Sequence, residues 1–261
     1  MKNRRSCGDE DVWVVPKKES KHPGKEVVEY VDANYTMDVL CWLHNGFTDE
    51  SGVPVEVHLR PSFMSEPCKN RRFQKHFADI LSCKTVTELE GAVIPCMKVD
   101  EDVIYQMNHI YRHLIDEGVG MRQVVDYFYL LKSWDEQHKR SKEETIKIVY
   151  WLGMKRFAGA LMFVLKELLG MPEEYLLCPA SIEDGNFLLN EIIMSGYFGH
   201  NDPRMGSITS EGGYLQRRAS QALRRFKRNM RFLTSFPGEV IWEPIVRVEH
   251  FVWKKLKMWK S

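Results

Sequence analysis

The spacing of apolar residues along this 261-residue chain changes near residue 98. Ahead of that point, apolar residues alternate with polar ones in short runs, which is typical of strands with one buried face. Behind it they recur every three or four residues, which is the spacing of one face of an α-helix. The chain is therefore expected to be α+β, with an α/β domain at 1–97 followed by an all-helical domain at 98–261.

Helical spacing predicts six helices in the second part. They cover residues 100–118, 120–134, 142–155, 157–171, 183–196 and 214–233. Acidic residues in the first turn of 100–118 and Gly118 after its last turn suit the two ends of a helix. The apolar segment 157–171 is expected to be core, and Pro237 is expected to break the last helix ahead of an aromatic, basic tail.

The first part is expected to contain strands at 11–15 and 53–59, separated by loops and a mixed segment. Gly, Pro and Asp residues mark the loops at 16–26 and 47–54, and the second of these suits a hairpin turn. The segment 27–45 can be a strand followed by a helix, but periodicity alone does not decide its structure.

The charge balance and the cysteine pattern exclude several classes of protein. Lys and Arg total 37 against 36 Asp and Glu, so there is no global field to attract nucleic acid or an anionic membrane. No apolar run approaches the ~18 residues of a membrane span, and the first dozen residues lack the apolar region of a signal peptide. The six cysteines form no C-x-x-C pair, which favours free thiols over a disulfide framework or a zinc site. We therefore expect a cytoplasmic protein without a membrane partner.

Two acidic residues stand at the start of the first expected strand. Asp9 and Asp11 are two residues apart, so in an extended strand they point to the same side of the sheet. Their like charges repel, and a divalent cation that prefers oxygen ligands, such as Mg²⁺, would relieve the repulsion. The pair is therefore a candidate metal site.

The second expected strand adds a third carboxylate if it pairs beside the first. Its apolar residues face a core, while Glu56, His58 and Arg60 share the opposite face. Three carboxylates on neighbouring strands can hold two metal ions and deprotonate an attacking hydroxyl for in-line phosphoryl transfer. A solvated turn and an ordinary half-exposed strand explain the same residues without a metal, and the spacing does not decide between these readings.

Several segments of the chain carry a shared pattern. They are RSCGDEDVWV at 5–14, VEVHLRP at 55–61, and the stretch from His109 and His113 to EGVGMRQVVD at 117–126. In this order they resemble the polymerase-β-type nucleotidyltransferase superfamily and, more narrowly, a family of largely uncharacterised bacterial nucleotidyltransferases. A looser similarity continues through FLLNE at 187–191 and FPGE at 236–239, so the resemblance covers most of the chain.

The resemblance implies transfer of a nucleoside monophosphate from an NTP to an unknown hydroxyl acceptor, assisted by Mg²⁺ or Mn²⁺. By this resemblance Asp9 and Asp11 would be metal ligands and catalytic residues. Glu56 would be the third ligand and would activate the acceptor hydroxyl. His58 and Arg60 would contact the acceptor or the phosphates. The implied fold of 1–97 is an incomplete polymerase-β-like domain.

One element of the superfamily's pattern is missing ahead of the first carboxylates. The superfamily places a Gly-containing strand–helix element there, whose backbone N–H groups grip the triphosphate. Only eight residues precede Asp9, which is too few for a strand and a helix. We therefore expect either an N-terminally truncated form or a relic that kept the fold without the catalysis.

The segment 214–231 is the most basic part of the chain, with seven basic residues and no acidic one. Four of its arginines fall on one helical stripe, namely Arg217, Arg224, Arg228 and Arg231, and apolar residues including Phe226 and Met230 fall on another. A solvated helix face explains this pattern. The alternative is a patch for phosphate, either of an NTP or of a nucleic-acid backbone. On that alternative the chain is a non-catalytic interaction or RNA-binding protein.

A histidine pair is the remaining candidate for metal binding. His109 and His113 are four residues apart and share a helix face, and an H-x-x-x-H pair can bind zinc. No third ligand is evident beside them. We therefore expect both to be core histidines, or histidines that support a neighbouring group, rather than metal ligands.

Overall fold

The structure is a computed structural model that describes residues 10–14, 23–41, 43–79, 83–89, 91–116, 118–195, 202–205 and 213–258. The fold is mixed α+β. The chain divides into two compact units: unit 1 is Met1–Phe63 with Ile245–Ser261, and unit 2 is Met64–Pro244. The units divide after Phe63, whereas we expected a domain boundary after residue 97. Residues 64–97 group with the helices, as the 2.7 Å contact between His76 and Glu101 illustrates.

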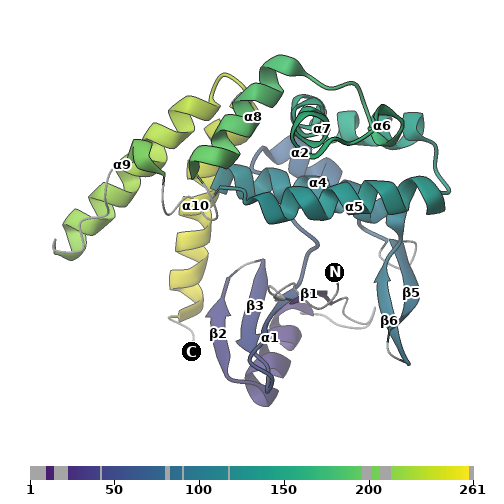
Figure 1. Cartoon of the computed structure of the whole chain (residues 1–261). Coiled ribbons are helices and arrows are strands. Elements are labelled where there is room, and N and C mark those ends of the chain that lie inside the picture. Colours follow the sequence, from purple (N-terminus) through teal and green to yellow (C-terminus); the bar gives the residue numbers. More distant parts are fainter. Residues whose placement is uncertain are drawn as a thin grey trace. The chain divides into compact units, whose positions relative to one another are not determined.

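Unit 1 contains a four-stranded sheet, one complete helix and, from Ile245 onward, the second part of the last helix (Figure 1). Its elements are β1 (Glu10–Trp13), α1 (Pro23–Asn34), β2 (Met37–Leu40), β3 (His44–Thr48) and β4 (Pro54–His58). The strand order is β1-β4-β3-β2. β1 pairs parallel to β4, and the other two pairings are antiparallel. The expected hairpin turn joins β3 to β4, and Gly52 adopts a φ of 82° in it.

One face of this sheet carries the core of unit 1. Val55 and Val57 of β4 pack with Phe47 of β3 and with Val27 and Val31 of α1. Because side chains alternate along a strand, the residues between these valines point to the other face of the sheet. The predicted division of β4 into an apolar and a polar face is confirmed.

Unit 2 is built mainly from helices (Figure 1). In chain order its main elements are α2 (Pro67–His76), β5 (Lys84–Leu89), β6 (Ala92–Met97), α4 (Val99–Asp116), α5 (Met121–Gln137), α6 (Lys142–Trp151), α7 (Lys155–Leu169), α8 (Ile182–Ser195), α9 (Tyr214–Phe232) and the first part of α10 (Pro237–Met258). The six predicted helices are confirmed to within a few residues as α4–α9. No helix among the described residues is long and apolar enough to cross a membrane.

The ends of two helices follow their glycines. Gly118 has a φ of 109° and its N–H donates to the carbonyl of His113 at 2.7 Å, which closes α4. Gly170 has a φ of 65° and ends α7 in the same left-handed region. A residue with a Cβ is strained in this conformation, so glycine is favoured at both ends.

Three parts of the chain differ from expectation. In residues 27–45 the helix comes first, as α1, and β2 and β3 follow it. Residues 84–97 form the hairpin β5–β6, which the sequence analysis left unassigned. The expected tail after Pro237 is the 22-residue helix α10, with Pro237 as its first residue. Proline suits the first turn of a helix, where its missing N–H has no partner to lose.

Candidate metal centre on the sheet of unit 1

Parallel pairing brings two of the predicted carboxylates to one face of the sheet. Asp11 of β1 lies opposite Glu56 of β4 in the register of the two strands. Facing residues of neighbouring strands project to the same side, so both carboxylates lie on the face opposite the valine core. The condition set for the third carboxylate, that the two strands are neighbours, is met. Asp9, the other predicted carboxylate, lies outside the described residues.

His58 connects the two carboxylates. Its Nε2 lies 2.8 Å from Asp11 Oδ1 and 3.3 Å from Glu56 Oε2, and its side chain is 3% exposed. We expected His58 to contact an acceptor or a phosphate from the polar face of β4. In the structure its ring is buried within the carboxylate cluster.

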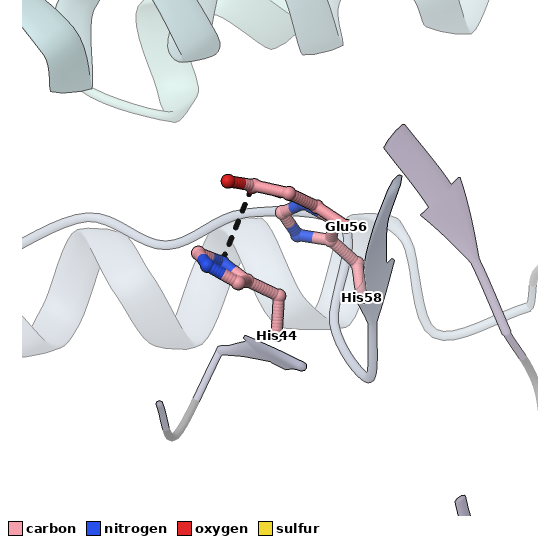
Figure 2. A group of neighbouring side chains, drawn as sticks. All are labelled: His44, Glu56 and His58. Carbon is pink, nitrogen blue, oxygen red and sulfur yellow. Dashed lines mark ion pairs between the residues drawn. The ribbon is translucent and has the colours of Figure 1, made fainter. Parts of the chain in front are cut away.

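His44 is the member of this cluster that the sequence analysis missed. It lies on β3, directly opposite His58 in the antiparallel register, so both imidazoles occupy the same face. His44 Nδ1 lies 3.4 Å from Glu56 Oε2, and Figure 2 shows the three side chains converging from two strands. The sequence shows only a histidine a few residues ahead of the expected hairpin turn. Its position beside His58 can be recognised only once the register of β3 and β4 is known.

The charges within the cluster support one another. Burial opposes the ionised form of Glu56, but the hydrogen bond from His58 and the nearby His44 outweigh it, and the pKa of Glu56 is lowered. Burial likewise opposes a charged His58, but hydrogen bonds to Asp11 and Glu56 outweigh it, and the pKa of His58 is raised. The cluster therefore favours an ionised Glu56 beside a positively charged His58. A bound cation could supply the same positive charge.

The types of ligand atom in the cluster indicate which ions it could bind. Asp11 and Glu56 offer the oxygen ligands that Mg²⁺ prefers. His44 and His58 offer imidazole nitrogens, which suit Zn²⁺ and related ions and are poor ligands for Mg²⁺. Suitable ligand atoms of His44, Glu56 and His58 all lie within 4.8 Å of one another. The carboxylates therefore fit the ion that the resemblance implies, and the imidazoles extend the choice to softer ions.

The predicted cationic residues are spread over both units. Arg60 is exposed and follows β4 in unit 1. Arg217 and Arg224 lie on α9 in unit 2, where Arg217 is exposed and Arg224 is half-buried. The structure thus brings Asp11, Glu56 and His58 together, and it assigns Arg217 and Arg224 to the other unit.

The basic helix α9 packs within unit 2 through part of its basic side. Arg228 donates to the main-chain carbonyls of Leu114 and Asp116 at 2.5 and 2.6 Å. Arg231 lies 3.4 Å from Glu191 and 3.3 Å from Asp202. Some of the basic residues counted as a phosphate patch are therefore engaged by protein groups.

The two looser segments of the resemblance supply buried acids to unit 2. Glu191 makes a paired contact with Arg204 at 2.7 and 2.9 Å. Glu239 accepts from the backbone N–H of Ser65 at 2.6 Å and from Lys69 Nζ at 3.3 Å. Both acids are buried and hold separate chain segments together. Their contacts give them a structural role in unit 2.

The two histidines of the pair on α4 are half-buried rather than core side chains. The rings of His109 and His113 lie 4.5 Å apart. Burial, together with the charges of Arg112 and His109, lowers the pKa of His113 to about 2. This environment disfavours positive charge, which makes it unfavourable for a metal ion as well.

Comparisons of this chain with protein-family models, with curated proteins and with solved structures found no match. The resemblance to nucleotidyltransferases therefore rests on the sequence motifs alone.

Proposed function

We propose that this chain transfers a nucleoside monophosphate from an NTP to a hydroxyl acceptor, using the carboxylate cluster of unit 1. The supporting observation is the facing position of Asp11 and Glu56 on adjacent parallel strands. Paired carboxylates on one sheet face suit metal-assisted phosphoryl transfer, because the ion offsets their repulsion and binds phosphate oxygens. The resemblance of residues 5–14 and 55–61 supplies the reaction class.

The two carboxylates of the cluster, Asp11 and Glu56, have separate roles in this proposal. A divalent cation, when bound, would neutralise the triphosphate and orient it for attack. Asp11 and Glu56 would hold that cation, with Asp9 as the further ligand that the resemblance implies. Glu56 accepts the proton of the acceptor hydroxyl, for which it must be ionised, and its lowered pKa keeps it so at neutral pH.

The reaction then balances as a single displacement. The acceptor oxygen forms a bond to the α-phosphorus of the NTP. The bond from that phosphorus to the oxygen bridging the α- and β-phosphates breaks, and pyrophosphate leaves. Buried His58 keeps both carboxylates in position, because its Nε2 contacts one oxygen of each.

Calorimetric titration of each NTP into the full chain tests the proposal, with Mg²⁺ or Mn²⁺ present and with EDTA. We expect cation-dependent binding that falls by at least about 10-fold in Asp11→Asn and in Glu56→Gln, because each loses a charged ligand. Glu10→Gln is the matched control. Glu10 neighbours Asp11 on β1 but lies opposite Val55 rather than Glu56, and it is exposed.

The control variant should bind the NTP as the unchanged protein does. Binding that is equal in Asp11→Asn and in the unchanged protein would contradict the assigned site. Absence of binding for every NTP and both cations would contradict the function for this chain.

A further inference from the structure

We propose that His44, Glu56 and His58 bind a divalent transition-metal ion of the Zn²⁺ type in preference to Mg²⁺. The inference deepens the proposed function and rests on it for the role of the ion. The choice of ion is argued from the donor atoms. Two imidazoles and one carboxylate form the ligand set used by many zinc enzymes, in which a fourth position stays open.

The spacing of the donor atoms matches such a site. With Zn–N and Zn–O bonds of about 2.0–2.1 Å, neighbouring ligands of a tetrahedral ion lie about 3.3 Å apart. Glu56 Oε2 lies 3.4 Å from His44 Nδ1 and 3.3 Å from His58 Nε2. Asp11 Oδ1, 2.8 Å from His58 Nε2, is a candidate for the fourth position, which water can otherwise take.

Strand pairing sets the positions of the proposed ligands without a bound ion. His44 and His58 face each other on antiparallel strands, and Glu56 is two residues from His58 on β4 (Figure 2). Sites built on paired strands hold their geometry better than sites built on loops. The side chains of His44 and Glu56 are 17% and 29% exposed, so an ion can still reach them from solvent.

Elsewhere in the described part of the chain, no second group of three His, Cys, Asp or Glu side chains converges in this way. Cys41, which is in no disulfide, lies three residues before His44, and thiols can also bind Zn²⁺. A test of the proposal must therefore separate nitrogen and oxygen ligands from sulfur ligands.

The experiment titrates Zn²⁺, Mn²⁺ and Mg²⁺ separately into the full chain after removal of bound metal with EDTA. We expect one tight Zn²⁺ per chain, at least about 10-fold tighter than Mg²⁺, with Mn²⁺ between them. His44→Gln and Glu56→Gln should weaken Zn²⁺ binding by at least about 10-fold. His109→Gln, a histidine of unit 2, and Cys41→Ser are the controls and should leave this binding unchanged.

The visible absorption of the Co²⁺-loaded chain identifies the ligands directly. We expect the bands of a four-coordinate ion without thiolate charge transfer. A far-UV circular dichroism spectrum that matches the unchanged protein shows that Glu56→Gln, which keeps the side-chain shape, still folds. Equal or tighter binding of Mg²⁺, or Zn²⁺ binding that survives His44→Gln and Glu56→Gln, would overturn the proposal.

The same variants separate this proposal from nucleotidyl transfer. Mg²⁺-dependent NTP binding without Zn²⁺ binding would reject the metal preference and leave the proposed function standing. Zn²⁺ binding lost in His44→Gln, without any NTP binding, would support the metal site and reject the proposed function.

Discussion

Strand β4 and helix α9 both carry one apolar and one polar face, but they use these faces in opposite ways. β4 turns Val55 and Val57 towards the core of unit 1 and leaves Glu56 and His58 on the other face, in the candidate metal centre. On α9 the apolar stripe points outward, and Phe226 is 63% exposed. The inward side of α9 includes Arg228 and Arg231.

The reason lies in what each element packs against. β4 meets the apolar side chains of α1, so its valines are buried. α9 meets the C-terminal end of α4, whose last carbonyls lack partners within their own helix. Arg228 supplies donors to two of these carbonyls, and Arg231 contacts the buried Glu191 and Asp202. An amphipathic pattern thus shows that an element has two faces, while the neighbouring element decides which one is buried.

The largest expected effect on stability comes from placing a charge on the apolar face of β4. Val57→Asp would bury an unpaired charge against α1, and we expect it to lower the free energy of unfolding by more than about 4 kcal/mol. Urea denaturation measures this loss. Glu10→Gln, at an exposed position of the neighbouring strand, should change the value by less than about 0.5 kcal/mol. Similar values for the two variants would contradict the assigned core face.

Removal of Arg231 tests whether the basic side of α9 holds it in place. Arg231→Met leaves the buried Glu191 and Asp202 paired with Arg204, and we expect the free energy of unfolding to fall by about 2 kcal/mol at pH 7. Arg225→Met, at an exposed position of the same helix, is the control and should have almost no effect. A loss of equal size in both variants would mean that the ion pairs do not anchor the helix.

The loss of stability caused by Arg231→Met should depend on pH. Burial opposes the ionised form of Asp202, but hydrogen bonds and charge from Arg204, with the charge of Arg231, outweigh it and lower its pKa. A lowered pKa in the folded state gives stability that is present above the ordinary value of 3.8 and is lost as the pH falls through the folded value. Urea denaturation at pH 7, 5 and 3 should therefore show the difference from the unchanged protein shrinking at the lowest pH.

An asparagine in the core of unit 1 gives a smaller effect of opposite sign. Asn45 lies opposite Val57 and is buried, and neither polar atom of its side chain has a hydrogen-bond partner within the described residues. Asn45→Val should raise the free energy of unfolding by about 1 kcal/mol, because unsatisfied buried polar groups are removed. Thr87→Val, at an exposed position of strand β5, is the control. A destabilised Asn45→Val variant would show that the amide is satisfied in solution.

The smallest effect is expected on the exposed stripe of α9. Phe226→Gln should shift the free energy of unfolding by less than about 0.5 kcal/mol, because this ring is mostly in water already. Phe232→Ala on the same helix should cost about 3–5 kcal/mol, since its ring is buried and packs 5.3 Å from that of Phe187. Thermal unfolding compares the two. A cost above about 1 kcal/mol for Phe226→Gln would mean that the stripe is covered in solution.

Much of the fold followed from local patterns. The helices from α4 to α9 have long stretches of regular spacing, and glycines end α4 and α7 at left-handed positions. Short elements were harder, because a four-residue strand such as β2 contains too few residues for a period to emerge. The hairpin β5–β6 was missed, and much of its surface, including Val86 and Val93, is exposed. Without a buried side, a strand shows little alternation.

Part of the candidate site could likewise be predicted from the sequence, and part could not. Asp11 and Glu56 could be paired from the sequence, because strand alternation fixes which residues share a face once two strands are adjacent. His44 could not, since its segment had no assigned structure and its importance lies in the register with His58. Arg217 and Arg224 were grouped with the site by charge alone, and they belong to the other unit.

The sequence by itself determined the mixed α+β composition, the polar face of β4 and the positions of most helices. These depend on periodicity and on the conformational limits of single residues, which act over a few neighbouring positions. The tertiary structure alone decided that His44 joins Glu56 and His58, and that α9 turns Arg228 and Arg231 inward. Both outcomes depend on which chemical groups a distant segment presents, and no pattern within one segment contains that information.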